Sequence, residues 1–285
     1  MTQILTTPLV APVRSARTRH YVMCPPTEFD VVYSINPWMD PSTAVDRELA
    51  RAQWQALQDV YAGLGHRIDL LEPVAGLPDM VFAANGAVSV ADRTYGAAFA
   101  FPQRQAEAHA HVDFLRAAGR EVHRPAHTNE GEGDFLVLRD VVLAGHGFRT
   151  TTDAHREAEA ALGRPVVSLE LVDPRFYHLD VALGVLDDGH GDGPADIAWF
   201  PAAFSPAARR TLRRMFPGAL ECFEADALAF GLNFVSDGRN VVLPAEATGL
   251  AASLRERGYE PVPVELSEFV KGGGSVKCCT AELHR

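Results

Sequence analysis

The sequence has few cysteines and none of the common motifs for metals or nucleotides. Its four cysteines are Cys24, Cys222, Cys278 and Cys279, and the last two are adjacent, an arrangement that does not easily form a disulfide bond. In a chain of 285 residues this pattern favours a reducing cytoplasm over a disulfide-stabilised secreted protein. No C-x-x-C or H-E-x-x-H motif occurs, nor a phosphate-binding loop or dinucleotide fingerprint. We therefore expect no metal site and no cofactor.

Positive charge is also in short supply, and so are long apolar runs. Lys and Arg number 26 against 37 Asp and Glu, which gives a formal net charge of −11 at pH 7. This balance argues against nucleic acid or an anionic membrane as a partner and favours a small cationic molecule. No apolar run approaches the roughly 20 residues that a membrane-spanning helix requires. The oligomeric state stays open, a homo-oligomer included.

Apolar residues make up 47% of the chain, which is enough for a large core. We expect residues 1–18 to be a flexible leader and residues 19–285 to form a single catalytic domain. Within that domain the secondary-structure signals recur in the order strand, strand, helix, strand. The clearest unit has strands at 135–138 and 141–144, a helix at 152–162 and a strand at 166–171.

The same order is expected in three further stretches, 80–123, 180–223 and 233–264. A fifth unit would combine both ends of the chain: a strand at 19–24, a helix at 42–64 that Thr43 can cap, a strand at 66–71 and a terminal strand at 275–283. A period of roughly 50 residues predicts an array of like units, and joining the last unit to the first closes a ring. Short polar motifs stand at corresponding places in the units, at 78–86, 129–135, 176–180 and 230–234 and in the C-terminal glycine and cysteine stretch. We expect them to face one central site.

The stretch K-G-G-G-S-V-K-C-C-T-A-E-L carries the strongest candidate for reactivity. Three consecutive glycines let the backbone approach a ligand closely. Cys278 follows them, at the start of the expected terminal strand, and the cation of Lys277 would favour its thiolate. Cys278 is therefore a candidate nucleophile. The alternative is that both adjacent cysteines are small buried hydrophobic residues.

His178 and Asp180 are candidates for acid–base chemistry and for binding a cation. They stand in F-Y-H-L-D, where we expect an apolar strand that carries both side chains on one face. An imidazole there can transfer protons near neutral pH, and a carboxylate can pair with a planar guanidinium. The alternatives are a hydrogen-bonded core histidine and an ion pair at a strand edge.

Other polar candidates allow a functional and a structural interpretation. Glu130, Glu132 and Asp134 place three acids within five residues, which suits a bound cation but also a solvated loop. Asn36 and Asn85 offer amides to a ligand or to the local backbone. Arg104 is able to pair with a substrate carboxylate, or to sit exposed in the first turn of its helix.

Taken together, the five-fold repeat, the H-L-D triplet and the C-terminal G-G-G-x-x-x-C resemble the pentein superfamily of guanidine-modifying enzymes. This superfamily includes arginine deiminases, dimethylarginine dimethylaminohydrolases, amidinotransferases and arginine dihydrolases. The resemblance runs from about Arg19 to the end of the chain. It implies an α/β fold, a five-bladed propeller of ββαβ units around a pseudo-five-fold axis, with the active site at the centre.

The resemblance also implies roles for individual residues. Cys278 matches the nucleophile and His178 the general acid and base, while Asp180 matches the aspartate that deiminases place on the guanidinium. Glu130 stands in an E-G-x-G-D run that is one residue longer than the deiminases' E-G-G-D. The substrate-binding residues implied by the match are Asn36, Asn85, Arg104, Glu130 and Asp180.

Asn85 stands where deiminases carry an aspartate and arginine dihydrolases an asparagine, and I-N-P-W-M-D and C-C-T are similar to stretches of the dihydrolases. The resemblance therefore implies a cofactor-independent arginine dihydrolase that forms a covalent thiouronium and releases ornithine, ammonia and carbon dioxide. A dimethylargininase or a deiminase on the same fold, acting on arginine or a methylated arginine, is the nearest alternative. A non-catalytic arginine-binding protein is the alternative from another class.

Overall fold

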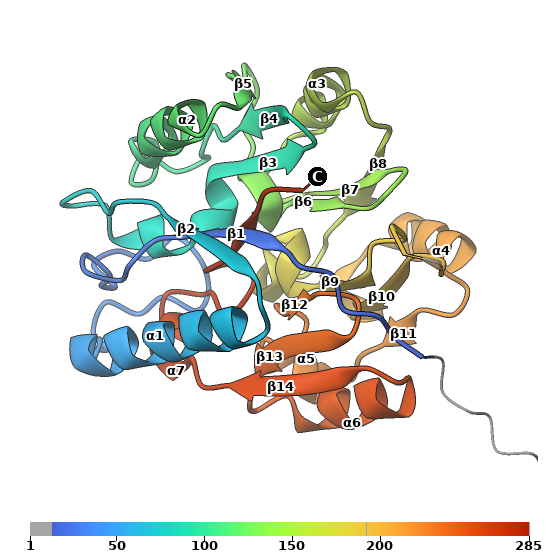
Figure 1. Cartoon of the computed structure of the whole chain (residues 1–285). Coiled ribbons are helices and arrows are strands. Elements are labelled where there is room, and N and C mark those ends of the chain that lie inside the picture. Colours follow the sequence, from blue (N-terminus) through green and yellow to red (C-terminus); the bar gives the residue numbers. More distant parts are fainter. Residues whose placement is uncertain (1–12, 192, 285) are drawn as a thin grey trace, which may run out of the picture.

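The strands form five three-stranded sheets in the computed structural model, which describes residues 13–191 and 193–284 (Figure 1). Four sheets are built from consecutive strands, and the fifth combines the first two strands with the last. The sheets and the helices between their strands are β1 (His20–Met23), α1 (Arg47–Gly63), β2 (Arg67–Leu70) and β15 (Ala281–Glu282); β3 (Ala87–Val90), β4 (Arg93–Gly96), α2 (Glu107–Ala117) and β5 (Glu121–His123); β6 (Phe135–Val137), β7 (Val142–His146), α3 (Thr152–Leu162) and β8 (Val166–Glu170); β9 (Leu183–Asp187), β10 (Asp196–Trp199), α4 (Pro206–Met215) and β11 (Leu220–Glu221); β12 (Val235–Ser236), β13 (Asn240–Pro244), α6 (Thr248–Glu256) and β14 (Glu260–Val264). Two short helices, α5 (Glu224–Leu228) and α7 (Ser267–Val270), lie between sheets in the sequence.

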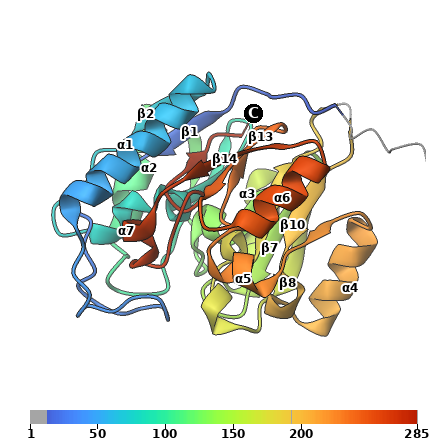
Figure 2. The ribbon, with the colours of Figure 1, turned by 90° about the horizontal axis from the view of Figure 1, so that it is seen from below.

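All five sheets repeat one hydrogen-bonding pattern. The central strand pairs antiparallel with one neighbour and parallel with the other, as β7 does with β6 and β8. A helix connects each pair of parallel strands, because parallel neighbours need a crossover connection. In Figure 2, α1, α4 and α6 lie on the outside of the ribbon. The mixed α/β class predicted from the sequence is therefore confirmed, and β15 pairs with β1, as expected for a unit shared by the two chain ends.

Local sequence explains where the helices begin and end. The predicted helix at 152–162 is confirmed: Thr151 accepts a hydrogen bond from Ala154 N at its start, and Gly163 adopts a φ of 64° after its end. The first helix begins at Arg47 and not at residue 42, because Asp46, and not Thr43, accepts hydrogen bonds from the free N–H groups of the first turn. Predicted boundaries elsewhere are displaced by a few residues.

Three segments that we expected to be strands are turns, and one of them, 80–82, lies at the end of a 3₁₀ helix at Pro78–Val81. His178 precedes a 3₁₀ helix at Leu179–Val181, so His178 and Asp180 do not share the face of a strand. The residues from 275 to 279 form a tight turn in which Cys279 N donates to Ser275 O, and the terminal strand is only Ala281–Glu282. These predictions were wrong because an apolar alternation also fits a buried turn whose backbone groups bond to neighbouring turns.

The first twelve residues of the expected leader lie outside the described residues, but those that follow contact the domain. Arg14 pairs with Asp196 and lies 4.0 Å over the ring of Tyr259. Arg17 N donates to Asp237 O, and the side chains of Arg17 and Arg19 both pair with Asp188. The division at residue 18 stays a prediction.

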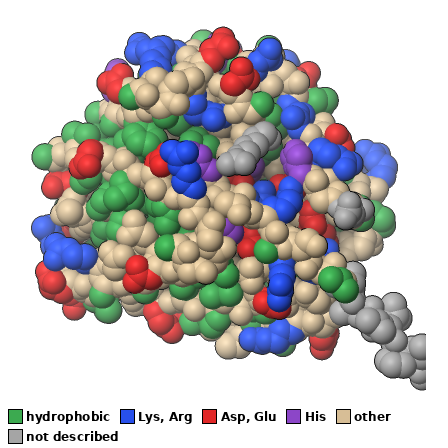
Figure 3. All heavy atoms as spheres, in the orientation of Figure 1, with side chains coloured by type: hydrophobic (Ala, Val, Ile, Leu, Met, Phe, Trp, Pro, Cys, Tyr) green, Lys and Arg blue, Asp and Glu red, His purple; other side chains and the backbone are tan. Residues whose placement is uncertain are grey.

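Charged groups lie around the last strand, β15, where Arg19 pairs with Glu282 and both Lys277 and His284 pair with Glu132. Figure 3 shows histidine, basic and acidic side chains beside one another on the face seen in Figure 1. A cavity of about 50 Å³ beside this strand is lined by Arg19, Glu132, Lys277, Glu282 and His284, among others. Within the described part of the chain, none of the helices combines the length and the apolar character needed to cross a bilayer.

Candidate active site

Buried turns that precede strands of different sheets contact one another. Ala84 N donates to Cys278 O over 3.1 Å, and Lys277 N donates to Asn233 O over 3.0 Å. Leu179 N donates to the carboxylate of Asp134 over 3.1 Å. The short polar motifs identified in the sequence are therefore in contact, and each precedes the strand that pairs antiparallel with the central strand of its sheet.

Cys278 is enclosed in this cluster, with 2% of its surface exposed. Its Sγ donates to Asp180 Oδ2 over 3.4 Å and accepts from Asn233 Nδ2 over 3.2 Å. Burial, reinforced by the negative charge of Asp180, raises the pKa of the thiol well above its ordinary value. The expectation that Lys277 activates the thiol was wrong: Lys277 Nζ points to Glu132 Oε2 at 2.5 Å. These surroundings therefore favour the neutral thiol over the thiolate.

Asp180 is poised for a cation. Its Oδ2 accepts from Cys278, while its Oδ1 is buried and has no hydrogen-bond partner among the described residues. Burial raises the pKa of this carboxyl to about 7, although the charge of Lys277 opposes the shift. Because an unpaired buried carboxylate is costly, a ligand that brings a positive charge and N–H donors would be favoured here.

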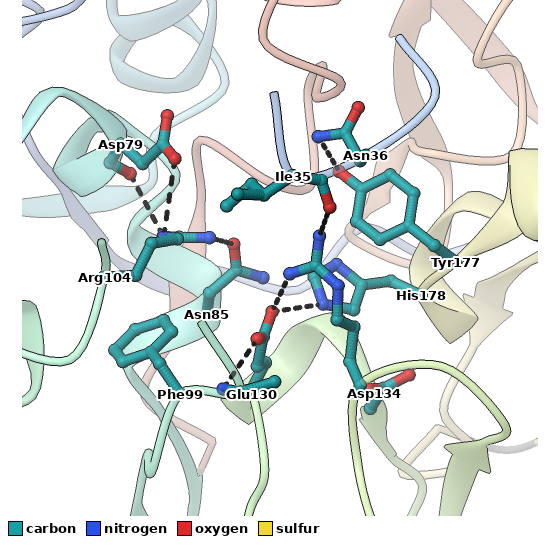
Figure 4. A network of polar contacts seen from close by, with 12 residues as sticks. Ile35, Asn36, Asp79, Asn85, Phe99, Arg104, Glu130, Asp134, Tyr177 and His178 are labelled. Atoms are coloured by element: carbon teal, nitrogen blue, oxygen red, sulfur yellow. Dashed lines mark hydrogen bonds and ion pairs between the residues drawn. The ribbon is translucent and has the colours of Figure 1, made fainter. Parts of the chain in front are cut away.

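His178 is held by a buried carboxylate on one side and is free on the other (Figure 4). Its Nε2 donates to Glu130 Oε2 over 2.7 Å, and its Nδ1 is buried with no partner. Burial alone would raise the pKa of Glu130, but the hydrogen bond from His178 and the charge of Arg149 outweigh it and lower this pKa to about 2. Glu130 therefore stays ionised and fixes the imidazole, whose free nitrogen is available to exchange a proton.

Asn85 is oriented by Arg104. Arg104 Nη1 donates to Asn85 Oδ1 over 2.8 Å, and Glu107 holds the same guanidinium through two further bonds. Because a guanidinium only donates, the amide oxygen of Asn85 must face Arg104 and its NH₂ group must face the site. Asn85 Nδ2 is buried there without a partner. The site thus receives a hydrogen-bond donor from this residue.

The unpaired groups of Asn85 and His178 converge over Gly133. A Cβ atom at this position would lie 2.5 Å from Asn85 Nδ2 and 3.1 Å from His178 Nδ1. The absent side chain therefore keeps open a space that two unpaired polar atoms face. The three glycines at 272–274 are covered by the chain itself, since the same Cβ would meet Asn36 or Phe82 within 3.0 Å.

Asn36 bonds to the glycine loop that precedes Cys278. Its Nδ2 donates to Gly272 O over 3.1 Å, and its Oδ1 accepts from Trp38 N over 2.9 Å. In the same loop, Ile35 O accepts from Arg149 Nη2 over 2.7 Å. The loop that contains Ile35 and Asn36 thus crosses the cluster of buried turns. Asn36, which the sequence predicted to bind substrate, is therefore among the residues that the structure brings together.

Glu132 and Asp134 have partners within the chain. Glu132 pairs with Lys277 and accepts from Glu282 N, on the side of the C-terminal strand. Asp134 accepts from Thr150 Oγ1 and Leu179 N, and burial raises its pKa to about 6. They therefore hold the turns in place. Among the described residues, no group of three or more His, Cys, Asp or Glu side chains is arranged to hold a metal ion.

Three residues near the site were missed by the sequence analysis. Arg149 lies between the rings of Phe101 and Tyr177, at 4.5 and 4.7 Å, and its Nη1 donates to Glu130 Oε2. Asp79 accepts from Tyr33 and has one unpaired buried oxygen, and Asn233 bonds to Cys278. Asp79 and Asn233 lie in motifs that the repeat had marked, whereas no sequence pattern marked Arg149.

Comparison with known proteins gives close relatives, although no family model matches the chain. The N(G),N(G)-dimethylarginine dimethylaminohydrolase of Mycobacterium tuberculosis is 54% identical over 271 residues, which cover 95% of this chain and 88% of that protein. The bifunctional arginine dihydrolase/ornithine cyclodeaminase AgrE of Nostoc is 34% identical over 92% of this chain. The chain matches only 37% of the length of AgrE.

Solved structures agree with these sequence relatives. The N-terminal domain of ArgZ, an arginine dihydrolase of cyanobacteria, was solved as a cysteine-to-serine mutant bound to its substrate. It has a TM-score of 0.87 and 31% identity, with 94% of this chain and 98% of that domain covered. A dimethylarginine dimethylaminohydrolase of Pseudomonas aeruginosa, bound to citrulline, has a TM-score of 0.79 at 19% identity, which is evidence of the fold alone.

Proposed function

Because the chain belongs to the pentein superfamily, with the dimethylarginine dimethylaminohydrolases and arginine dihydrolases, we propose that it is an L-arginine dihydrolase. The broader activity, hydrolysis of guanidino C–N bonds, is common to these relatives. The finer proposal rests on the orientation of Asn85, whose NH₂ group and not its oxygen faces the site. In this proposal the five sheets surround a pseudo-five-fold axis and residues 19–285 form one catalytic domain.

In the proposed complex the guanidinium lies against Asp180. Its N–H groups bond to the unpaired Oδ1 of Asp180, and its charge compensates the carboxylate beside Cys278. A cation at this place favours loss of the thiol proton, so the substrate itself generates the nucleophile. The neutral thiol of the unliganded protein is consistent with such activation.

The reaction then proceeds in two rounds. The Cys278 thiolate adds to the guanidinium carbon, His178 protonates the departing ammonia, and a covalent thiouronium remains. Water, deprotonated by His178, adds to the same carbon and expels the thiolate, which gives citrulline. A second round on the ureido group, with a second water, releases a further ammonia and leaves the carbamate of ornithine, which loses carbon dioxide to give ornithine. Two waters are consumed per arginine.

In this proposal Asn85 determines whether the reaction stops at citrulline after the first round or continues to ornithine in a second. A guanidinium carries only donors around its carbon, whereas a ureido group carries one carbonyl oxygen. An amide NH₂ group directed into the site matches that oxygen and holds citrulline for a second attack. An aspartate at this place would instead repel the oxygen, and the reaction would stop at citrulline.

The remaining polar groups suit the amino-acid part of the substrate. Arg149 would bind the α-carboxylate together with Arg104 and Asn36, and the free oxygen of Asp79 would accept from the α-ammonium group. Since Cys278, His178 and Asp180 are each at most 2% exposed, the substrate enters only when the loop around Ile35 moves away. A small cationic amino acid is thus the partner we propose, in the cytoplasm.

Product analysis tests the function. We expect purified protein incubated with L-arginine to yield ornithine and two ammonia per arginine consumed, measured by amino-acid chromatography and an ammonia assay. Asn85→Asp is the matched variant, because it keeps the size and removes the donor; it should accumulate citrulline. Citrulline as the sole product of the wild-type protein would identify a deiminase and refute the dihydrolase.

A second candidate, dimethylargininase, is favoured by the 54% identity to an enzyme of that name. It is distinguished by incubating the protein with asymmetric dimethylarginine under the same conditions. This candidate would be favoured if dimethylamine and citrulline formed from asymmetric dimethylarginine faster than products form from arginine. If neither substrate is consumed while bound arginine is detected by calorimetry, the chain is a binding protein.

Gly133→Ala is expected to impair both stability and turnover. The added methyl group would overlap Asn85 Nδ2, which Arg104 holds in place, and overpacking of this kind costs about 1–3 kcal/mol of unfolding free energy. We expect turnover of arginine to fall about 10-fold or more, because a displacement of roughly 1 Å in a reacting geometry has effects of this size. Urea unfolding and steady-state kinetics measure the two effects.

Gly63→Ala is the control for that variant. Its Cβ would meet no atom within 4 Å, and it lies at the end of α1, so stability and turnover should stay near those of the wild-type protein. Wild-type turnover in Gly133→Ala would show that the space over Gly133 is not used in the reaction.

A further inference from the structure

One buried amide, that of Asn233, contacts Cys278 at two atoms. Asn233 Oδ1 accepts from Cys278 N over 3.1 Å, and Asn233 Nδ2 donates to Cys278 Sγ over 3.2 Å. The same Nδ2 donates to Asp180 O over 3.2 Å, and Asn233 has no exposed surface. The amide therefore joins the sulfur, the backbone of the cysteine and the backbone of the neighbouring aspartate.

These partners fix which end of the amide faces the sulfur. The backbone N–H of Cys278 requires an acceptor, and the carbonyl of Asp180 requires a donor, so the amide cannot be reversed. In the neutral thiol the sulfur donates to Asp180 and accepts from Asn233. When the proton leaves, the contact with Asp180 becomes repulsive, whereas the bond from Asn233 becomes charge-assisted and stronger.

Among the described residues, no positively charged side chain forms a hydrogen bond with the Cys278 sulfur. Lys277, the cation next in sequence, bonds to Glu132 and to Thr280 O, and no hydrogen bond joins it to the sulfur. We infer that Asn233 is a catalytic residue whose Nδ2–H stabilises the Cys278 thiolate. This inference rests on the proposed function in that it assumes Cys278 to be the nucleophile.

The fold holds Asn233 firmly in this position. The residue ends a turn in which Asn233 N donates to Phe230 O, and Phe230 itself has a φ of 56°, a left-handed conformation that is uncommon outside glycine. The ring of Phe230 packs against Trp38 at 4.7 Å, and Asn233 O accepts from Lys277 N. The amide is thus pre-organised and needs no rearrangement when charge develops on the sulfur.

Asn233→Asp removes one of the two contacts with Cys278 and keeps the other. The aspartate keeps an oxygen for Cys278 N–H but replaces the donor to the sulfur by a second carboxylate oxygen. We expect the midpoint of the pH dependence of Cys278 alkylation by iodoacetamide, followed by peptide mass spectrometry, to rise by about one to two pH units. With arginine, kcat should fall by roughly 10- to 100-fold, while KM changes less.

Two comparisons complete the test. Gln53→Glu is the matched control, because Gln53 is another buried amide that accepts from a backbone N–H, that of Glu268, and donates to a hydroxyl, that of Ser267, and none of its described bonds goes to Cys278. Its alkylation midpoint should equal that of the wild-type protein. If Asn233→Asp does not fold, Asn233→Ser, whose hydroxyl is too short to keep both contacts, should raise the midpoint in the same direction.

The inference would be overturned if the alkylation midpoint of the folded Asn233 variant equalled that of the wild-type protein. It would also be overturned if Gln53→Glu raised the midpoint as much as the Asn233 variant does. The alkylation measurement is independent of turnover. A wild-type protein that consumes no guanidine compound would therefore refute the proposed function, while the alkylation midpoint would still report on the contact between Asn233 and the thiol.

Discussion

Cys278→Ser is expected to abolish turnover of arginine, with a loss of roughly 10³-fold or more, while the fold is retained. A hydroxyl group fills nearly the same space and can keep the hydrogen bonds with Asp180 and Asn233. It is a far weaker nucleophile, because a guanidinium beside it does not lower its pKa enough to form the alkoxide. Steady-state kinetics and the thermal unfolding temperature measure the two parts of this result.

The adjacent thiol supplies the control. Cys279 is fully buried, its hydrogen bond among the described residues joins its backbone N–H to Ser275 O, and burial raises the pKa of its thiol. Cys279→Ser should therefore keep turnover within a few-fold of the wild type and lose some stability. If Cys278→Ser remained active and Cys279→Ser were inactive, the nucleophile would be Cys279 and not Cys278.

His178→Asn is expected to reduce turnover by about 10²- to 10⁴-fold, the usual contribution of a general acid–base group. The asparagine is able to donate to Glu130 but not to exchange a proton near neutral pH. Glu130 keeps its ion pair with Arg149 and its bond from Ala100 N, so the buried carboxylate is not left without partners. We expect the variant to fold, and to bind arginine in a calorimetric titration with near-normal affinity.

His155→Asn tests whether any buried histidine would give this effect. His155 is as deeply buried as His178, but both of its ring nitrogens have partners, Ser168 Oγ and Gly145 O. Losing these bonds should cost about 1–3 kcal/mol of unfolding free energy and leave turnover nearly unchanged. If both histidine variants lose stability and activity in parallel, His178 is a structural residue.

The strand–strand–helix–strand period identified the repeated unit because each unit has its own apolar pattern and its own turn signals. The helix at 152–162 was predicted to the residue, since Thr151 and Gly163 mark its two ends. The start of α1 was misplaced because Thr43 and Asp46 are both suitable caps, and only packing chose between them. The turns around His178 and Cys278 were taken for strands because their alternation of apolar residues reflects burial from several sides.

For the candidate site, the motifs marked which turns matter but not what each side chain does there. Lys277 stands next to Cys278 in the sequence, yet its amino group pairs with Glu132. Arg104 stays a predicted substrate-binding residue, but only the structure shows that it bonds to Asn85, Asp79 O and Glu107. Arg149 carried no signal at all, because its position depends on Glu130, Ile35 and two aromatic rings from distant segments.

The sequence by itself determined the α/β class, the period of the units and the identity of the polar turns, because these follow from local propensity and from the spacing of apolar residues. Only the tertiary structure decided which atoms face one another. It turned the oxygen of Asn85 toward Arg104, left nitrogens of Asn85 and His178 unpaired over Gly133, and placed the amide of Asn233 on the sulfur. Such choices depend on contacts between segments far apart in the chain, and a linear pattern does not contain them.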